Sequence, residues 1–327
     1  MFLARRRLVI ILISISLIIP VFGCSQPSQP AKVLNIGLLL GSGGLGDRSF
    51  NDSAYAGLLE AQKKYNIRFE TVDTGTLEAN KDALSLFARN NYDLIIAVAF
   101  ENMASLQAVA AEFPDTHFAG IDFELTADNV SSIVYREQEG DFLMGALAAM
   151  LTKTKKVDVI GGTDIPAIHR IMTGYVQGAA YQDPGVTVLT DFAGTFADPA
   201  VGLSLALKRF GEGVDVIHNA ASKTGLGIIQ AAAQVNKLVT GTSGDQRYLA
   251  PGNMVGNRPK RVDTAVMLLV DEVYNDSFKP GVRSLGLKEN GLTLGPFDQN
   301  IVTPQITARL DELKQKIITG QIVVKAE

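Results

Sequence analysis

Short apolar runs alternate with amphipathic stretches along most of the chain. Runs such as Leu34–Leu40 and Leu94–Val98 predict buried strands, and the stretches between such runs carry apolar residues at helical spacing. We expect further strands at residues 67–72, 117–121, 157–160, 187–191, 214–218, 238–240 and 292–294, with an extended stretch at 131–135. We expect helices from residue 49 onward and at 77–90, 105–113, 139–152, 165–182, 199–210, 225–235, 261–274 and 305–318. This alternation predicts parallel sheets with helices on both faces, the α/β class.

The strand–helix pattern restarts after residue 152, which predicts two similar lobes rather than one long sheet. We assign residues 33–123 and about 258–280 to an N-terminal lobe. Residues 124–257 and about 281–327 are assigned to a C-terminal lobe. Chain crossings between two such lobes form a hinge, and the strand ends of both lobes face a cleft. Ligand capture by closure of the cleft is the use that this arrangement favours.

The first 23 residues have the features of an export signal. Arginines at residues 5–7 precede an apolar run at 8–19, which is short for a membrane span. Val21-Phe22-Gly23 then precedes Cys24, a pattern with the form of a bacterial lipobox. We expect Cys24, the only cysteine, to be lipidated after residues 1–23 are removed, and residues 24–32 to form a tether. The alternative is an ordinary secretory signal followed by an unpaired cysteine.

The chain that follows the signal is acidic. The formal net charge of the whole sequence is −4, and the signal holds three arginines and no acidic residue. An acidic body argues against nucleic acid or anionic lipid as a partner. No other apolar run reaches the length of a membrane span. We therefore expect a lipid-anchored protein on the extracytoplasmic face of the cell membrane.

A glycine-rich loop follows the first strand. It contains glycines at positions 41, 43, 44 and 46 and leads into a helix, where Ser49 and Asp52 have the spacing of a capping box. Such a loop lies at the carboxyl edge of a sheet, where α/β folds bind ligands. Phe50 and Asn51, in the first turn of the helix, are expected to face that edge. The loop lacks the lysine pattern of a phosphate-binding loop.

Several motifs together resemble the basic membrane protein family of lipoproteins, which are purine nucleoside receptors of ABC transporters. The most specific is Gly46-Asp47-Arg48-Ser49-Phe50-Asn51, and the others follow in family order. These others are Phe118–Asp122, Gly194-Thr195-Phe196 with Asp198-Pro199, Thr224–Gly227, Gly244-Asp245-Gln246 and Lys260–Asp263. The resemblance implies the type I periplasmic-binding fold, with two Rossmann-like lobes joined by three crossings.

The resemblance also implies a set of ligand-binding residues. Family members stack the purine between two phenylalanines, which fall on Phe50 and Phe196 here. Face contact on both sides of a flat heterocycle gives affinity without strict choice of base. The aspartate that hydrogen-bonds the base falls on Asp122, and the lysine that holds the ribose falls on Lys260. Asn51 follows the first ring and is expected to face the cleft.

Three positions depart from the family pattern. Gly41 and Ser243 stand where the family has ribose-binding aspartates, and Ser222-Lys223 stands where it has paired glycines. Loss of two carboxylates removes charge-assisted acceptors for sugar hydroxyls. We hypothesise that the cleft, with Ser222 and Ser243 in its wall, keeps the base platform and has an altered sugar end. The ligand is then a free nucleobase, a modified nucleoside or another flat heterocycle.

Other polar residues have structural interpretations. Asp47 is expected to order the glycine loop and Asp245 to form a loop. His117, His169 and His218 have no metal-ligand spacing, although His218, at a predicted strand end, is also a candidate for ligand contact. We expect no catalytic residue, no metal and no cofactor.

The sequence thus predicts a monomeric solute-binding lipoprotein that serves an ABC importer. Its partners are a small-molecule ligand, a permease and the membrane that holds its lipid. Two alternatives stay open. One is a ligand sensor of the same fold that feeds a membrane receptor. The other is an exported nucleoside hydrolase, which would need more acidic residues near the first loop than Asp47 and Asp52.

Overall fold

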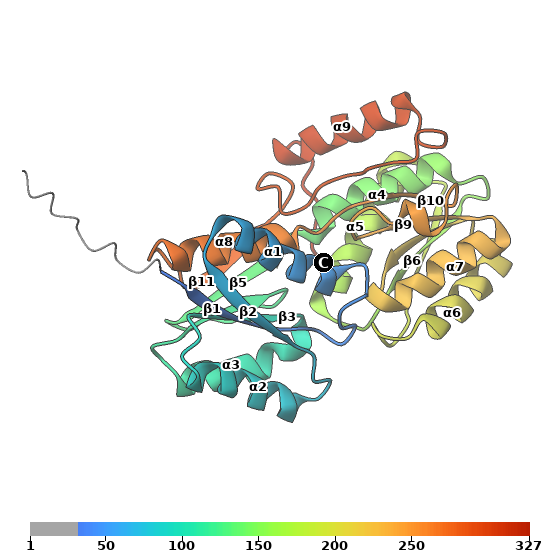
Figure 1. Ribbon diagram of the computed structural model, residues 1–327. Coiled ribbons are helices and arrows are strands. Elements are labelled where there is room, and N and C mark those ends of the chain that lie inside the picture. The colour runs from blue at the N-terminus through green and yellow to red at the C-terminus, as the bar shows by residue number, and fades with distance from the viewer. Residues whose placement is uncertain (1–31) are drawn as a thin grey trace, which may run out of the picture. The chain divides into compact units, whose positions relative to one another are not determined.

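Two parallel β-sheets organise residues 32–327, the part of the chain that the computed structural model describes (Figure 1). The predicted signal, Cys24 and nearly all of the predicted tether lie outside these residues. The six-stranded sheet has the order β11-β5-β4-β3-β1-β2, and the five-stranded sheet has the order β10-β9-β8-β6-β7. The first sheet contains β1 (Leu34–Leu39), β2 (Ile67–Val72), β3 (Leu94–Val98), β4 (His117–Ile121), β5 (Val130–Tyr135) and β11 (Gly281–Leu285). The second contains β6 (Lys156–Gly161), β7 (Thr187–Phe192), β8 (Val216–Ala220), β9 (Leu238–Gly241) and β10 (Met254–Asn257).

Helices cover both faces of each sheet. In Figure 1, α2 (Leu77–Arg89) and α3 (Met103–Glu112) lie on one side of the first sheet, and α1 (Phe50–Lys64) and α8 (Val262–Tyr274) lie on the other. The second sheet is covered by α4 (Glu137–Leu151) and α5 (Pro166–Gln182) on one face. Its other face is covered by α6 (Pro199–Gly211) and α7 (Gly225–Val235). The last helix, α9 (Pro304–Ile318), packs on α4.

The central strands are apolar at consecutive positions, so both of their faces are buried. All five residues of β3 are inaccessible to solvent, and Ile36 of β1 pairs in register with Leu94 of β3. Continuous apolar strands of this kind are typical of parallel sheets with helices on both faces. The predicted α/β class is confirmed by this arrangement.

Some elements differ from the sequence prediction. Residues 292–294 form no strand, since Leu292 makes only an isolated bridge with Lys260. The prediction missed β10 and β11, which are short, and β11 alternates between half-buried and exposed residues as edge strands do. Because β5 pairs with β4 and β11 pairs with β5, both strands belong to the first sheet, whereas the predicted division placed them in the C-terminal lobe. The lobe bounds as a whole stay a prediction.

Within residues 32–327 the chain passes between the two sheets three times. It does so between β5 and α4, between β10 and α8, and after β11. These crossings lie next to one another, because Lys260 on the second bridges to Leu292 on the third, and Arg136 N on the first donates to Leu285 O, at the end of β11. The carboxyl ends of both sheets therefore face a common space beside the crossings.

Candidate functional site

A cavity of about 590 Å³ lies at the carboxyl ends of the two sheets. The first sheet contributes the loop after β1, the start of α1 and the residues after β3 and β4. The second contributes the start of α5 and the loops after β7, β8 and β9. All seven residues that the sequence placed in a ligand site line this cavity, namely Phe50, Asn51, Asp122, Phe196, Ser222, Ser243 and Lys260. Their role in binding stays a prediction.

Two aromatic rings enter the cavity from opposite sheets. Phe50 comes from the first turn of α1, and Phe196 comes from the loop between β7 and α6; both are half-buried. Gly162 makes room for the second ring, since a Cβ at that position would overlap it. Ile165, directly before α5, and Ile168, in its first turn, add apolar surface to the same cavity. The cavity therefore has apolar surface on two sides.

The start of α1 is held by Asp47. Its carboxylate accepts hydrogen bonds from the backbone N–H groups of Ser49 (2.8 Å) and Asn51 (2.9 Å). The predicted capping box is wrong, because the Ser49 side chain makes no capping bond and Asp52 instead accepts from Gly46 N and Arg48 N, each at 2.8 Å. A buried carboxylate that accepts several N–H groups at a helix N-terminus compensates their unpaired donors.

The side-chain amide of Asn51 belongs mainly to the same loop. Its Oδ1 accepts from Gly41 N at 2.8 Å, and its Nδ2 donates to Asp47 Oδ2 at 3.1 Å. Only 2% of Asn51 is exposed. Asn51 lines the cavity as expected, but two of its hydrogen bonds fix the loop that carries Phe50.

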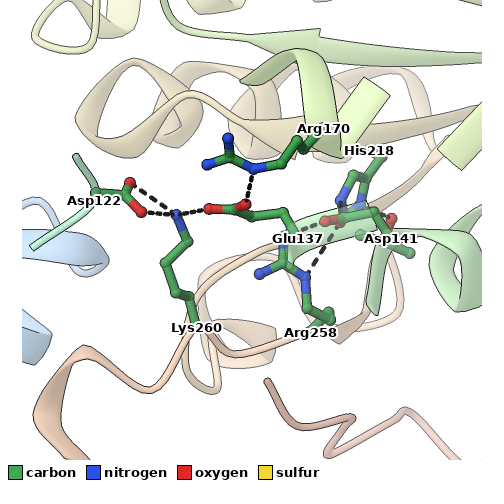
Figure 2. A network of polar contacts seen from close by, with 8 residues as sticks. Asp122, Glu137, Asp141, Arg170, His218, Arg258 and Lys260 are labelled. Carbon is green, nitrogen blue, oxygen red and sulfur yellow. Dashed lines mark hydrogen bonds and ion pairs between the residues drawn. The ribbon is translucent and has the colours of Figure 1, made fainter. Parts of the chain in front are cut away.

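A buried charge network forms the wall where the crossings meet the first sheet (Figure 2). Lys260 Nζ donates to Asp122 Oδ1 at 2.7 Å, to Asp122 Oδ2 at 2.8 Å and to Glu137 Oε1 at 2.8 Å. Arg170 Nε donates to Glu137 Oε2 at 2.6 Å. The four side chains carry two charges of each sign, so this wall is neutral overall.

Burial acts differently on the two carboxyl groups of this network. Burial raises the pKa of Asp122, and the Lys260 ammonium only partly opposes it. Burial also disfavours ionised Glu137, but the charges of Lys260 and Arg170 outweigh it and hold the pKa of Glu137 below its usual range. The ammonium of Lys260 makes three contacts with carboxylate oxygens, the number of its N–H donors. Lys260 therefore neutralises this wall.

His218 lies behind the cavity rather than in it. It is in the middle of β8, fully buried, and its ring contacts Asp141 Oδ1 (2.9 Å) and Thr240 Oγ1 (2.8 Å). Burial lowers the pKa of His218. Figure 2 shows Arg258 of the second crossing paired with the same aspartate. The sequence misplaced His218 at a strand end because β8 runs two residues further than predicted.

Hydrogen bonds join the loops of the two sheets directly across the cavity mouth. Arg48 Nη1 donates to Tyr248 Oη at 2.6 Å, and its guanidinium lies 5.4 Å from the centre of that ring. Gln246 Nε2 donates to Arg48 O at 3.0 Å. The hydroxyls of Ser49 and Ser243 are 2.5 Å apart. In this structure the loops of the two sheets that form the site are therefore in direct contact.

Sequence reasoning missed Glu101 and Tyr248, which both line the cavity. The position of Glu101 directly after a buried strand is a signal that could have identified it. Tyr248 stands two residues after the Gly244-Asp245-Gln246 motif, and that position is a signal that could have identified it. Asp245 pairs both oxygens with Arg247, in keeping with the loop-forming role expected for it. Lys223, the second residue of the pair that replaces the family's glycines, is not among the described residues that line the cavity.

Two absences hold for the described chain. Among the helices of residues 32–327, none has the length and apolar character that a membrane crossing requires. The same residues contain no group of three or more His, Cys, Asp or Glu side chains placed to hold a metal ion.

Residues 35–327 match the model of the Bmp family, described as ABC transporter substrate-binding protein PnrA-like. The chain belongs to the Bmp family. A relative from Pyrococcus abyssi, named as an uncharacterised lipoprotein, is 30% identical over 93% of this chain and 87% of its own length. Bmp proteins of this kind are ABC transporter solute-binding proteins, not enzymes.

Solved structures agree with this assignment. The ABC transporter solute-binding protein of Aeropyrum pernix has a TM-score of 0.83 and 28% identity, with 90% of this chain and 94% of that chain covered. The glucose-galactose binding protein GanP of Geobacillus stearothermophilus has a TM-score of 0.59 and 15% identity, with 81% and 98% covered. The second likeness concerns the fold alone. This Bmp protein has the type I periplasmic-binding fold expected from the sequence.

Proposed function

We propose that this Bmp-family protein captures a purine nucleoside or a similar flat heterocycle between Phe50 and Phe196 and presents it to an ABC importer. The observation that carries the proposal is the entry of these two half-buried rings into one cavity from opposite sheets. Stacking of an aromatic side chain on a base contributes roughly 1–3 kcal/mol. Contact with both faces suits a planar ligand and no other common shape.

The size and polarity of the cavity support the same class of ligand. A volume of about 590 Å³ suits a single small molecule, and polar side chains stand beside apolar ones in its walls. Asp122 and Lys260 lie on one wall as a neutralised pair, which offers hydrogen bonds without net charge. The hydroxyls of Ser222 and Ser243 lie on the opposite sheet's loops. An uncharged heterocycle with polar edges fits these groups.

The cross-cavity hydrogen bonds support capture by closure. A solute-binding protein of hinged lobes holds its ligand when the lobes meet, and release requires them to part. In the proposed arrangement the lipid on Cys24 keeps the protein beside its permease. Its family relative named as a lipoprotein supports this location.

Calorimetry on the full chain tests the ligand class. The protein is unfolded and refolded to strip bound molecules, then titrated with guanosine, adenosine, guanine and adenine. We expect at least one of the four to bind with a Kd of about 1 µM or tighter. Mass spectrometry of small molecules released from untreated protein is expected to detect the same class. Absence of heat with all four, and release of a non-planar compound, would overturn the proposal.

A further inference from the structure

Glu101 is a carboxylate of the cavity wall that the sequence-based site did not include. It lies in the short helical turn Phe100–Asn102, directly after β3. Ser42 N donates to Glu101 Oε1 at 2.8 Å, which holds the side chain against the loop after β1. Within residues 32–327, no hydrogen bond or ion pair engages its Oε2. One oxygen of this carboxylate is therefore able to accept new hydrogen bonds.

The other carboxylates that line the cavity are engaged at both oxygens. The carboxylate of Asp52 accepts hydrogen bonds from two loop N–H groups. The other three carboxylates each pair with a basic side chain. These pairs are Asp122 with Lys260, Asp245 with Arg247 and Asp263 with Arg261. Glu101 thus differs from every other lining carboxylate of the described chain. Its Oε2 is therefore an anionic acceptor at the cavity wall that no described residue engages.

Gly41 explains why this carboxylate can reach the cavity wall. A Cβ at position 41 would lie 2.7 Å from Ala99 Cβ and 3.1 Å from Glu101 Oε1. A side chain at 41 would therefore compete with Glu101 for the same space. Gly41 stands where the family pattern has an aspartate at the end of β1. Because it has no side chain, the carboxylate of Glu101, which follows β3, has room there. The charge is supplied from a different strand of the same sheet.

We propose that Glu101 accepts hydrogen bonds from adjacent hydroxyls of the ligand and makes this protein selective for ribonucleosides over free bases. The inference rests on the proposed function, since it concerns the sugar end of the same ligand. A carboxylate beside two vicinal hydroxyls forms charge-assisted hydrogen bonds, which are stronger than those between neutral groups. The inference is an alternative to the altered-sugar hypothesis, because it assigns to Glu101 the acceptor whose loss that hypothesis assumes.

The test measures selectivity rather than affinity alone. Wild-type full chain and the Glu101→Gln variant are titrated with adenosine and guanosine, with their 2′,3′-dideoxy forms and with the free bases. In the wild type we expect the ribonucleoside to bind at least about tenfold tighter than its dideoxy form. In Glu101→Gln we expect that ratio to fall to about threefold or less, with the affinity for the free base unchanged within about twofold.

Glu60→Gln is the matched control. Glu60 is an exposed glutamate of α1 on the same lobe, and it does not line the cavity. The control makes the same change in net charge and is expected to keep the wild-type ratio. If Glu101 has a purely structural role, Glu101→Gln weakens the binding of nucleoside, dideoxynucleoside and base equally. It then also lowers the thermal midpoint of the ligand-free protein.

The outcomes separate this inference from the function on which it rests. If no purine compound binds the wild type, both fail. If purines bind but the ribonucleoside-to-dideoxy ratio is near one, or is unchanged in Glu101→Gln, the Glu101 inference fails and planar capture stands. A ratio that falls equally in Glu60→Gln also contradicts it, because long-range charge then explains the effect.

Discussion

Ser222 Oγ donates a hydrogen bond to Asp47 Oδ2 at 2.9 Å, although the two residues are 175 positions apart in the chain. Asp47 also caps the helix that carries Phe50, so one carboxylate connects an aromatic wall of the cavity to a loop of the other sheet. With the Arg48–Tyr248 and Ser49–Ser243 contacts, this bond forms a set that we name the cavity clasp. We expect the clasp to couple ligand enclosure to contact between the loops of the two sheets.

Weakening the clasp is expected to speed ligand release. Arg48→Ala removes the hydrogen bond to Tyr248 and the guanidinium over its ring. One such hydrogen bond contributes about 0.5–1.5 kcal/mol, so we expect dissociation to be roughly two- to tenfold faster, measured by stopped-flow fluorescence. The ligand-free radius of gyration from X-ray scattering is expected to increase.

Tyr248→Ala gives an independent version of the clasp experiment. It leaves the left-handed backbone of Arg48 (φ +51°) unchanged, so backbone strain does not enter. Arg89→Ala, at the exposed end of α2, serves as a control and is expected to release ligand at the wild-type rate. Equal rates in all four proteins would show that the clasp plays no part in retention.

Removal of either stacking ring is expected to weaken binding strongly. Phe50→Ala and Phe196→Ala each lose one face of the platform, which corresponds to roughly 1–3 kcal/mol, or about 5- to 150-fold in Kd by calorimetry. Phe192→Ala, an exposed ring of β7 outside the cavity, is the matched control. A loss of affinity in Phe192→Ala as large as in the other two would contradict stacking.

Lys260 is expected to stabilise the fold in a pH-dependent way. Lys260→Met leaves Asp122 and Glu137 without their shared cation, and removal of one partner of a buried ion pair costs about 3–5 kcal/mol. A carboxyl group of this pair then stays protonated in the folded variant but ionises in the unfolded chain. The free energy of unfolding of the variant therefore falls as pH rises. We expect urea unfolding to show a larger loss at pH 8 than at pH 5.

Two further variants separate this effect from a simple loss of charge. Lys223→Met removes a lysine outside the cavity lining and is expected to change stability by less than about 0.5 kcal/mol. Addition of Asp122→Asn to Lys260→Met is expected to recover part of the loss at pH 8. A loss that is the same at both pH values would argue that packing, not charge, is responsible.

Asp158 predicts a second pH dependence, in the second sheet. Burial and the neighbouring Asp191 carboxylate raise the pKa of Asp158 from 3.8 to about 8. The folded protein therefore keeps a proton that the unfolded chain loses above about pH 4, and this group's contribution to stability falls as pH rises towards 8. The slope for one proton is at most about 1.4 kcal/mol per pH unit.

The Asp158→Asn variant tests this contribution. The amide cannot ionise, so we expect the variant to gain stability relative to wild type as pH rises from 5 to 8, by up to about 4 kcal/mol. Urea unfolding at four pH values measures the difference. A difference that is flat across this range would show that Asp158 is ionised throughout.

Cys24 is expected to determine attachment to the membrane. Cys24→Ser removes the thiol that the lipid would modify, so we expect no incorporation of labelled palmitate and recovery of the protein in the soluble fraction. Cys24 lies outside the residues that the structure describes, and this prediction depends on the sequence pattern alone. Labelling of the variant at the wild-type level would place the anchor elsewhere.

Most strands and helices were predictable because apolar periodicity is a local property. Runs such as Leu94–Val98 are buried in any sheet that has helices on both faces, so the sequence alone indicates them. The edge strand β11 was missed for the converse reason. Residues 281–285 are half exposed, and only their pairing with β5 makes them a strand.

The candidate site divides in the same way. Phe50 and Phe196 were expected from motifs, and the structure brings both to one cavity. Motifs gave no indication that Lys260 contacts two carboxylates from different elements, or that Glu101 reaches the end of β1. Such contacts join residues distant in sequence, and the sequence contains no record of which distant partner a charge will meet.

By itself, the sequence indicated the α/β class, the restart of the pattern that separates the two sheets, and the two phenylalanines that line the cavity, because periodicity and short motifs depend on neighbours along the chain. Only the tertiary structure decided that Asp47 rather than Ser49 caps α1, that His218 lies behind the cavity, and which lining carboxylate keeps an oxygen unengaged. Those outcomes depend on distances between side chains from separate strands, which folding alone establishes.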